Sequence, residues 1–152
     1  MSKAPAFDVN TSLCSDNCCP PLFFAVGGKS KEAPAHEDCL AFVLGLPGVN
    51  VNLQNRHGIT ALRFAVHCGE VACVKLLLCA PSIDVNKLTI KDQVALHTAV
   101  DQCHLECIEL LLQASGIKIN MAEQGTLLCD VCACVPHPST HLLRVPLHRR
   151  FA

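Results

Sequence analysis

A short string that ends in asparagine recurs four times along this chain of 152 residues. The four copies are Phe7–Asn10, Val49–Asn52, Ile83–Asn86 and Ile117–Asn120. The last three asparagines are evenly spaced, because 86−52 and 120−86 both equal 34. A fixed period of about 20 to 50 residues indicates one supersecondary unit stacked on copies of itself. We therefore expect a solenoid, which contacts partners through an extended surface and not through an enclosed pocket.

Composition is compatible with one such stack. Apolar residues make up 51% of the chain, whereas aromatic residues make up only 4%, without Trp or Tyr. The core is thus expected to consist of aliphatic residues, Cys and a few Phe. The 12 basic and 13 acidic residues give a net charge of −1. This balance does not indicate a dedicated binder of nucleic acid or of an anionic membrane.

Two short helices can be predicted within the second copy of the period. Thr60 is a suitable N-cap for a helix over Ala61–Cys68. Gly69 can end this helix because glycine tolerates the left-handed conformation. A second helix is expected over Val71–Cys79, because its apolar residues recur at spacings of three and four. These residues are Val71, Val74, Leu77 and Leu78.

The motifs of this copy return in phase in the next. The second copy contains Gly58-x-Thr60-Ala61-Leu62-Arg63, Ala65-Val66, Gly69-Glu70 and Leu77-Leu78. The third contains Val94-Ala95-Leu96-His97, Ala99-Val100, Cys103-His104 and Leu111-Leu112. This pattern resembles the ankyrin repeat, in which Gly-x-Thr-Pro-Leu-His is followed by Ala-Ala, Gly-His and Leu-Leu. The resemblance implies an all-α solenoid of stacked helix-turn-helix repeats with extended turns between them.

Two departures from the pattern are expected to weaken the third copy. Val94 replaces the capping threonine, which costs about 1 kcal/mol at a helix start. Cys103 replaces the glycine that ends the first helix, and it needs an unfavourable backbone or a shifted turn. We expect this copy to be looser than the second.

The first copy is irregular. Pro21–Val26 parallels Ala61–Val66 at an offset of 40, whereas Cys39–Leu44 parallels Cys73–Leu78 at an offset of 34. The difference is a six-residue insertion, which we place at 27–38 in the loop between the two helices. Such an insertion in a surface loop either adds specificity or is simply tolerated.

A fourth copy begins but is interrupted by Pro136 and Pro138, where its second helix would form. The tail beyond it is expected to be a degenerate cap or disordered. The expected organisation is an N-terminal segment (1–16), an irregular repeat (17–52), the best-formed repeat (53–86), a further repeat (87–120), an incomplete repeat or cap (121–134) and a tail (135–152).

The twelve cysteines would suggest a disulfide scaffold only in a secreted protein. The first eight residues contain a charge and a proline where an export signal needs an apolar run, so we expect a cytoplasmic or nuclear protein. Cys39, Cys73 and Cys107 follow the same period, because 73−39 and 107−73 both equal 34, and thus occupy one repeat position. We expect all three to be small buried hydrophobes.

One group of residues has the character of a metal site. Cys129, Cys132, His137 and His141 approach the spacing of a zinc knuckle, but the knuckle's glycine and aromatic positions are missing. The leading interpretation therefore contains no metal and no cofactor. An alternative is a regulatory or capping fragment of a larger protein or complex, with a metal-dependent tail.

The resemblance also implies a function. Ankyrin repeats mostly bind proteins through the turn tips and the exposed side of each first helix. No Cys or His of this chain lies in a recognised nucleophile context, so we expect no enzyme activity. We expect an adaptor or scaffold that binds a partner protein on the concave face, without nucleic-acid binding or membrane insertion. The positions that correspond are Arg56, His57, Ile59, His67, Cys68, Ile90, Lys91, Gln93, Asp101 and Gln102. The expected core positions are Leu62, Ala65, Leu77, Leu78, Leu96, Ala99, Leu111 and Leu112.

Overall fold

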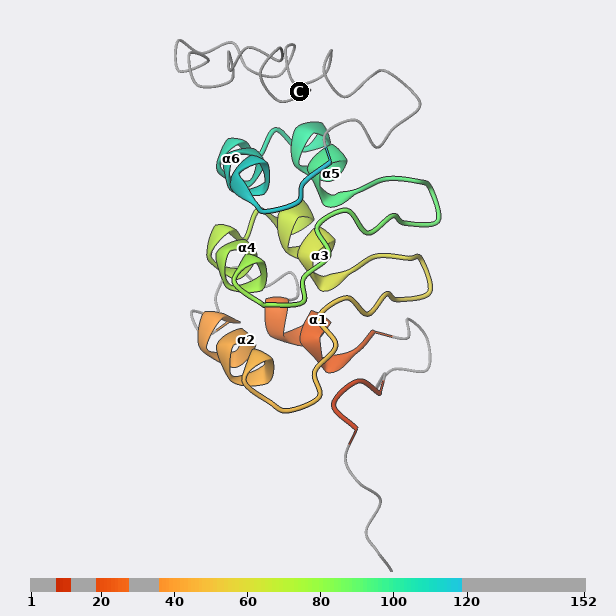
Figure 1. Cartoon of the computed structure of the whole chain (residues 1–152), viewed down its shortest axis with the longest axis vertical. Helices are drawn as coiled ribbons and strands as arrows, with labels where there is room; N and C mark the ends of the chain where they lie inside the picture. The colour runs from red at the N-terminus through yellow and green to blue at the C-terminus, as the bar shows by residue number, and fades with distance from the viewer. Residues whose placement is uncertain (1–7, 12–18, 28–35, 119–152) are drawn as a thin grey trace, which may run out of the picture.

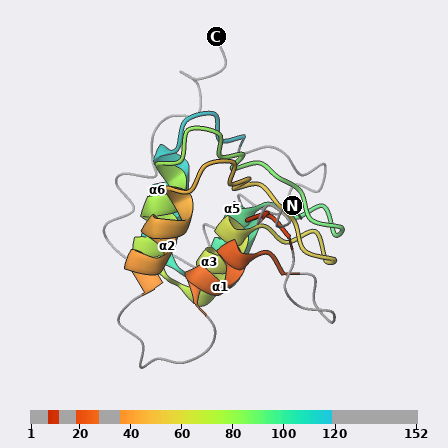
Figure 2. The same ribbon diagram turned by 90° about the horizontal axis from the view of Figure 1, so that it is seen from below.

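The computed structural model describes residues 8–11, 19–27 and 36–118. These residues form six α-helices and no extended strands: α1 (Pro21–Val26), α2 (His36–Leu44), α3 (Ala61–Cys68), α4 (Val71–Leu78), α5 (Ala95–Asp101) and α6 (Leu105–Gln113). Consecutive helices pair, and the three pairs are stacked along the long axis of the molecule (Figure 1). The helices lie in two layers, with α1, α3 and α5 in one and α2, α4 and α6 in the other (Figure 2). The predicted all-α repeat solenoid is confirmed.

The second helix pair follows the sequence pattern closely. Helix α3 spans the predicted residues, and the Arg63 backbone N–H donates to Thr60 Oγ1 at 3.3 Å. Gly69 ends the helix in the left-handed region with a φ of 72°. Helix α4 ends at Leu78, one residue before the predicted end. The cap and the glycine thus have the roles that their residue types predict.

The third helix pair has the same backbone conformation as the second, but different residues at the N-cap of its first helix and at its two positions with positive φ. Val94 offers no side-chain cap; instead its backbone N–H donates to His97 Nδ1 at 3.3 Å. Cys103 has a φ of 54°, so the predicted unfavourable backbone is confirmed. Asp92 also has a positive φ, of 53°. Asp92 lies one full period after Gly58, and its positive φ was not predicted from the sequence.

The recurring asparagines join each repeat to the next. Asn52 Nδ2 donates to the Ser82 carbonyl at 2.6 Å, and Asn52 Oδ1 accepts from the Asp84 N–H at 2.8 Å. Asn86 makes the same two bonds to Gly116 and Lys118, both at 2.8 Å. Each asparagine therefore satisfies one backbone acceptor and one backbone donor of the following copy. This pairing explains why the string recurs.

Asn10 makes the equivalent bonds to Gly48 and Asn50, both at 2.8 Å. The interval from Asn10 to Asn52 exceeds the period by eight, because 52−10 equals 42. Six of these extra positions form the predicted insertion between the helices, and the other two lie between Asn10 and α1, where the sequence analysis did not expect them. The segment 27–35 separates α1 from α2, whereas only Gly69 and Glu70 separate α3 from α4. The loop predicted at 27–38 is thus too long, because 36–38 form the first turn of α2. The limits of the segments at either end remain predictions, because 1–7, 12–18 and 119–152 lie outside the described residues.

The core runs between the two helix layers. Of the expected core positions, six are buried: Leu62, Ala65, Leu77, Leu96, Ala99 and Leu111. Leu78 and Leu112 are only partly buried, so the prediction that they are core residues was wrong. Each directly follows a fully buried leucine on an outer helix, α4 or α6, and is rotated from it toward solvent.

The shared cysteine position is buried in two repeats out of three. Cys73 and Cys107 are buried, as predicted, but Cys39 is exposed, so that part of the prediction was wrong. The Cys73 thiol lies 3.8 Å from the Val26 carbonyl oxygen of α1, which shows that this position faces the preceding repeat. Cys39 belongs to the first described helix pair, and no described helix pair precedes that one.

Candidate protein-binding face

Two hairpin-like turns project from the helix layers and lie side by side at the right of Figure 1. They precede α3 and α5, and the first is closed by an antiparallel bridge between Gln54 and Thr60. Asn55 Oδ1 accepts from the backbone N–H groups of His57 at 2.9 Å and Ile59 at 3.0 Å. Thr89, which is equivalent to Asn55, accepts the N–H groups of Lys91 and Gln93, each at 3.3 Å. The turn tips are thus held from inside by side-chain acceptors.

The two turns are also fixed to each other. Gln54 Nε2 donates to the Gly58 carbonyl in its own turn and to the Leu88 carbonyl in the next turn, both at 2.7 Å. A Cβ atom on Gly58 would lie only 2.7 Å from the Ile90 backbone nitrogen. Only glycine allows this approach, so the turns form one continuous edge.

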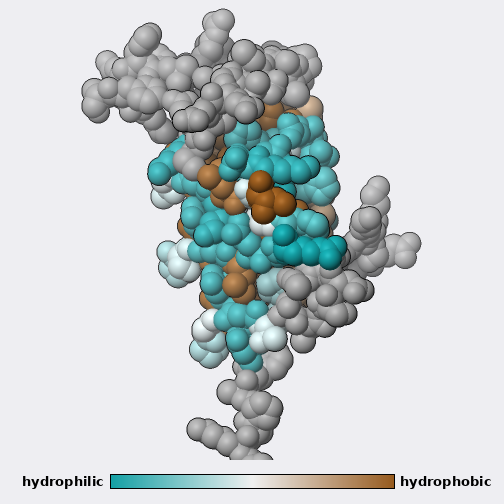
Figure 3. All heavy atoms as spheres, turned by 90° about the vertical axis from the view of Figure 1, so that its right-hand side faces the viewer, coloured by the Kyte–Doolittle hydropathy of each residue, from teal (hydrophilic) through white to brown (hydrophobic). Residues whose placement is uncertain are grey.

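Eight of the ten candidate binding residues are exposed: Arg56, His57, His67, Cys68, Ile90, Lys91, Asp101 and Gln102. Arg56 Nε donates to His57 Nε2 at 3.1 Å, which orients this pair at the first tip. Ile59 and Gln93 are partly buried. Gln93 Oε1 accepts from Arg63 Nη2 at 3.0 Å, so its side chain already has an intramolecular partner. Figure 3 shows that the side carrying the turns is largely hydrophilic, with isolated hydrophobic groups.

Comparison with known proteins agrees with this architecture. A family model described as ankyrin repeats, in three copies, matches residues 22–123. The chain belongs to the ankyrin-repeat family. Members of this family generally mediate protein–protein interaction and are typically not enzymes. A search of curated proteins finds no match to this chain.

The ankyrin stack contains a polar junction that the sequence analysis missed. Arg63 Nε donates to Thr98 Oγ1 at 2.8 Å, which links α3 to α5. Burial lowers the pKa of Arg63, and Asp101 partly opposes this effect. The equivalent residues one repeat earlier are Phe23 and Phe64, whose ring centroids are 5.9 Å apart. The period, with the six-residue insertion added, aligns Phe23 with Arg63, and the period alone aligns Phe64 with Thr98. The alignment does not show which side chains are long enough to contact each other across the junction between two repeats.

Three thiols of the ankyrin stack, those of Cys68, Cys73 and Cys107, are unsuited to nucleophilic chemistry. Burial raises the pKa of the Cys73 thiol to about 11, and the carboxylates of Glu70 and Glu37 act in the same direction. Burial and Glu106 likewise raise the pKa of Cys107. Cys68 is exposed, but partial desolvation by the neighbouring atoms and the carboxylate of Glu70 still raise its pKa. These thiols are protonated at neutral pH, and a protonated thiol is a poor nucleophile and metal ligand.

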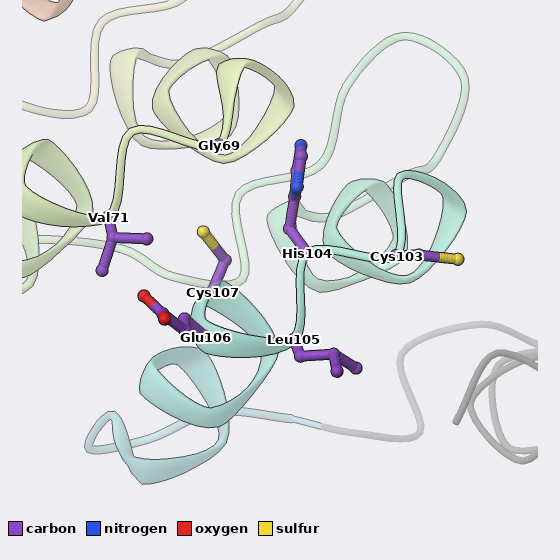
Figure 4. A pocket seen from close by; sticks show the side chains of 7 residues that line it. All are labelled: Gly69, Val71, Cys103, His104, Leu105, Glu106 and Cys107. Carbon is purple, nitrogen blue, oxygen red and sulfur yellow. The ribbon is translucent and has the colours of Figure 1, made fainter. Parts of the chain in front are cut away.

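A shallow cavity of about 300 Å³ lies where the second and third repeats meet, lined by Gly69, Val71 and 103–107. Figure 4 shows the His104 ring beside Gly69 and the Cys107 thiol directed toward the space between them and Val71. A Cβ on Gly69 would lie 2.9 Å from His104 Cε1, so the ring packs against the glycine. The cavity is therefore a packing feature of the repeat junction, and its buried thiol is protonated.

Within residues 8–11, 19–27 and 36–118, no group of three or more His, Cys, Asp or Glu side chains is arranged to hold a metal ion. The candidate zinc ligands Cys129, Cys132, His137 and His141 lie outside the described residues. Among the described helices, none is long and apolar enough to cross a membrane.

Proposed function

We propose that this ankyrin protein is a non-enzymatic adaptor or scaffold that binds a partner protein on the concave face, formed by the two turn tips with α3 and α5. The observation that carries the proposal is the fixed edge made by the turns. The Gln54 bonds and the close approach at Gly58 hold its two tips together. A preformed surface binds with less loss of conformational entropy than a mobile one.

The chemical character of the edge supports the same proposal. Arg56, His57, Lys91 and Asp101 expose charged or polar groups, and Ile90 exposes an apolar side chain between them in sequence. Protein interfaces combine an apolar centre with a polar rim. Cys68, on α3, has a raised pKa, which disfavours a catalytic role for the one thiol among the candidate binding residues.

The test is affinity capture of cellular proteins with quantitative mass spectrometry. The binding variant combines Arg56→Glu, His57→Ala, Lys91→Glu and Asp101→Lys, all at exposed positions. The matched control reverses four exposed charges on the outer helices, at Glu37, Lys75, Glu106 and Glu109. For proteins that both the wild type and the control capture, we expect the captured amount to fall about tenfold or more with the binding variant. Undiminished capture of every protein by the binding variant would contradict the proposal.

A further inference from the structure

The small net charge of the chain conceals an uneven distribution over the described surface. The turn segments 53–59 and 87–93 contain three cations and one carboxylate: Arg56, Lys87, Lys91 and Asp92. The outer helices with their N-caps contain the opposite balance, one cation and five carboxylates: Lys75, Glu37, Asp38, Glu70, Glu106 and Glu109. All these residues are exposed. The turns and the outer helices lie on opposite sides of the stack (Figures 1 and 2).

The basic edge also contains an unusual apolar group. Ile90 is 70% exposed, and Leu88 in the same turn is 38% exposed. Ile90 occupies the position equivalent to Arg56 in the preceding repeat. Its Cγ2 would lie 3.2 Å from a Cβ on Gly58, so the isoleucine packs over the glycine of the preceding turn. This contact positions Ile90 while leaving most of its surface open to a partner.

We infer that the partner presents an acidic segment with one large apolar side chain, which packs on Ile90 and Leu88 while its carboxylates contact Arg56, Lys87 and Lys91. This inference rests on the proposed function and specifies the partner's chemistry. Exposed apolar surface surrounded by charge is typical of a site for an apolar anchor with polar flanks. A carboxylate-rich segment is attracted to the basic edge and repelled by the outer helices, which selects the side on which it binds.

A nucleic acid shares the negative charge but fits the edge less well. Segments 53–59 and 87–93 contain no Phe, Tyr or Trp on which a base could stack. Their exposed apolar groups are aliphatic, which suits burial against an apolar side chain of a protein. The lack of an aromatic side chain in these two segments and their aliphatic exposed groups therefore both favour a protein partner over a nucleic acid.

The experiment is a selection from a displayed library of random peptides against the full chain, followed by affinity measurements on the enriched peptides. Two variants probe the edge: Arg56→Glu with Lys91→Glu, and Ile90→Ser. Each has a matched control on an outer helix. Lys75→Glu reverses an exposed lysine on α4, and Phe42→Ser removes an apolar side chain on α2 that is 71% exposed, compared with 70% for Ile90.

We expect enriched peptides to combine several Asp or Glu residues with one large apolar residue. Their affinity should fall about tenfold with each edge variant, remain unchanged with each control, and weaken as salt concentration rises. Unfolding midpoints of the variants establish that each is folded. The inference would be overturned if the enriched peptides were neutral or basic, or if no acidic peptide were enriched. It would also be overturned if the enriched peptides bound the edge variants as tightly as the wild type, or if the chain bound a single-stranded oligonucleotide and no peptide. If this happens while cellular capture still depends on the four binding-face residues, the partner chemistry is wrong and the binding face stands.

Discussion

In the second repeat, glycine occupies both backbone positions that adopt the left-handed conformation, Gly58 and Gly69; in the third, Asp92 and Cys103 occupy them. The φ angles differ little, at 69° and 72° against 53° and 54°. A residue with a Cβ atom in this conformation costs about 1–2 kcal/mol, less for Asp than for Cys. The period thus preserves the backbone of the repeat even where the residues no longer favour it.

The helix caps differ in the same direction. Thr60 caps α3 with its hydroxyl, whereas Val94 has no acceptor and depends on His97 to satisfy its own N–H. The third repeat therefore has a weaker helix start as well as two strained residues. It also supplies Ile90 and Lys91 to the proposed binding edge, so the repeat that we expect to be less stable provides much of the proposed contact surface. Binding surfaces are often drawn from the less stable parts of a protein.

The largest expected effect is at Gly58. Gly58→Ala places a Cβ 2.7 Å from the Ile90 backbone nitrogen and also strains a positive φ. We expect a loss of about 3 kcal/mol in the free energy of unfolding, measured by urea denaturation. Gly48→Ala is the matched control, because Gly48 has a φ of 82° with nothing within 4 Å of a Cβ. It should cost only about 1 kcal/mol from backbone strain. Equal losses would show that the two turns are not held by close approach.

A smaller effect, of opposite sign, is expected at Cys103. Cys103→Gly relieves the left-handed cysteine and should stabilise the protein by about 1 kcal/mol, because the relieved strain exceeds the entropy that glycine adds to the unfolded chain. Gly69→Cys makes the reverse change one repeat earlier and should destabilise it. The measurement is the free energy of unfolding of each variant in urea, compared with that of the wild type. If Cys103→Gly were destabilising, the third repeat would not be strained at this position.

The smallest effect concerns pH and His97. Burial lowers the pKa of His97 from its ordinary value of 6.5; Arg63 acts in the same direction, and Asp101 opposes them. The unfolded chain therefore takes up the proton at a higher pH than the folded protein. The stability from neutral His97 is fully present above about pH 6.5 and decreases as pH falls below it. Its Nδ1 acceptor for the Val94 N–H is lost on protonation.

His97 is only partly buried, so solvent screens its interactions with the neighbouring charges. We therefore expect the unfolding free energy to fall by less than about 1 kcal/mol between about pH 7.5 and about pH 5.5 from this residue. His97→Gln is the control, because Gln accepts the same N–H without titrating in this range. The measurement is the difference between wild type and control over this pH range. An unchanged difference, or a wild type that gains stability relative to the control on acidification, would show that His97 does not serve as a neutral cap.

Much of the fold could be predicted from the sequence, because the period aligns equivalent residues. It indicated the helices of the second repeat, the insertion before α2 and the strained backbone at Cys103. The period also aligns Asp92 with Gly58, but the residue type did not indicate the positive φ of Asp92, because Asp is found in many turn conformations. The period did not indicate the exposure of Cys39, because burial at that position depends on a preceding repeat and not on the residue itself.

The candidate binding face could be predicted only in part. Exposure of residues such as Arg56 and Lys91 follows from their places at turn tips. The Gln93 contact with Arg63 did not follow, because it joins two different repeats through side-chain reach. The packing of Ile90 over Gly58 likewise depends on the distance between neighbouring turns, which the sequence does not specify.

Native-state hydrogen exchange tests the unequal stability of the repeats most directly. The amides of α3 and α4 should exchange more slowly than those of α5 and α6, because the second repeat has a hydroxyl cap and two glycines where the third has neither. Cys103→Gly should slow exchange in the third repeat and narrow the difference. Stronger protection of α5 and α6 than of α3 and α4 in the wild type would contradict the account.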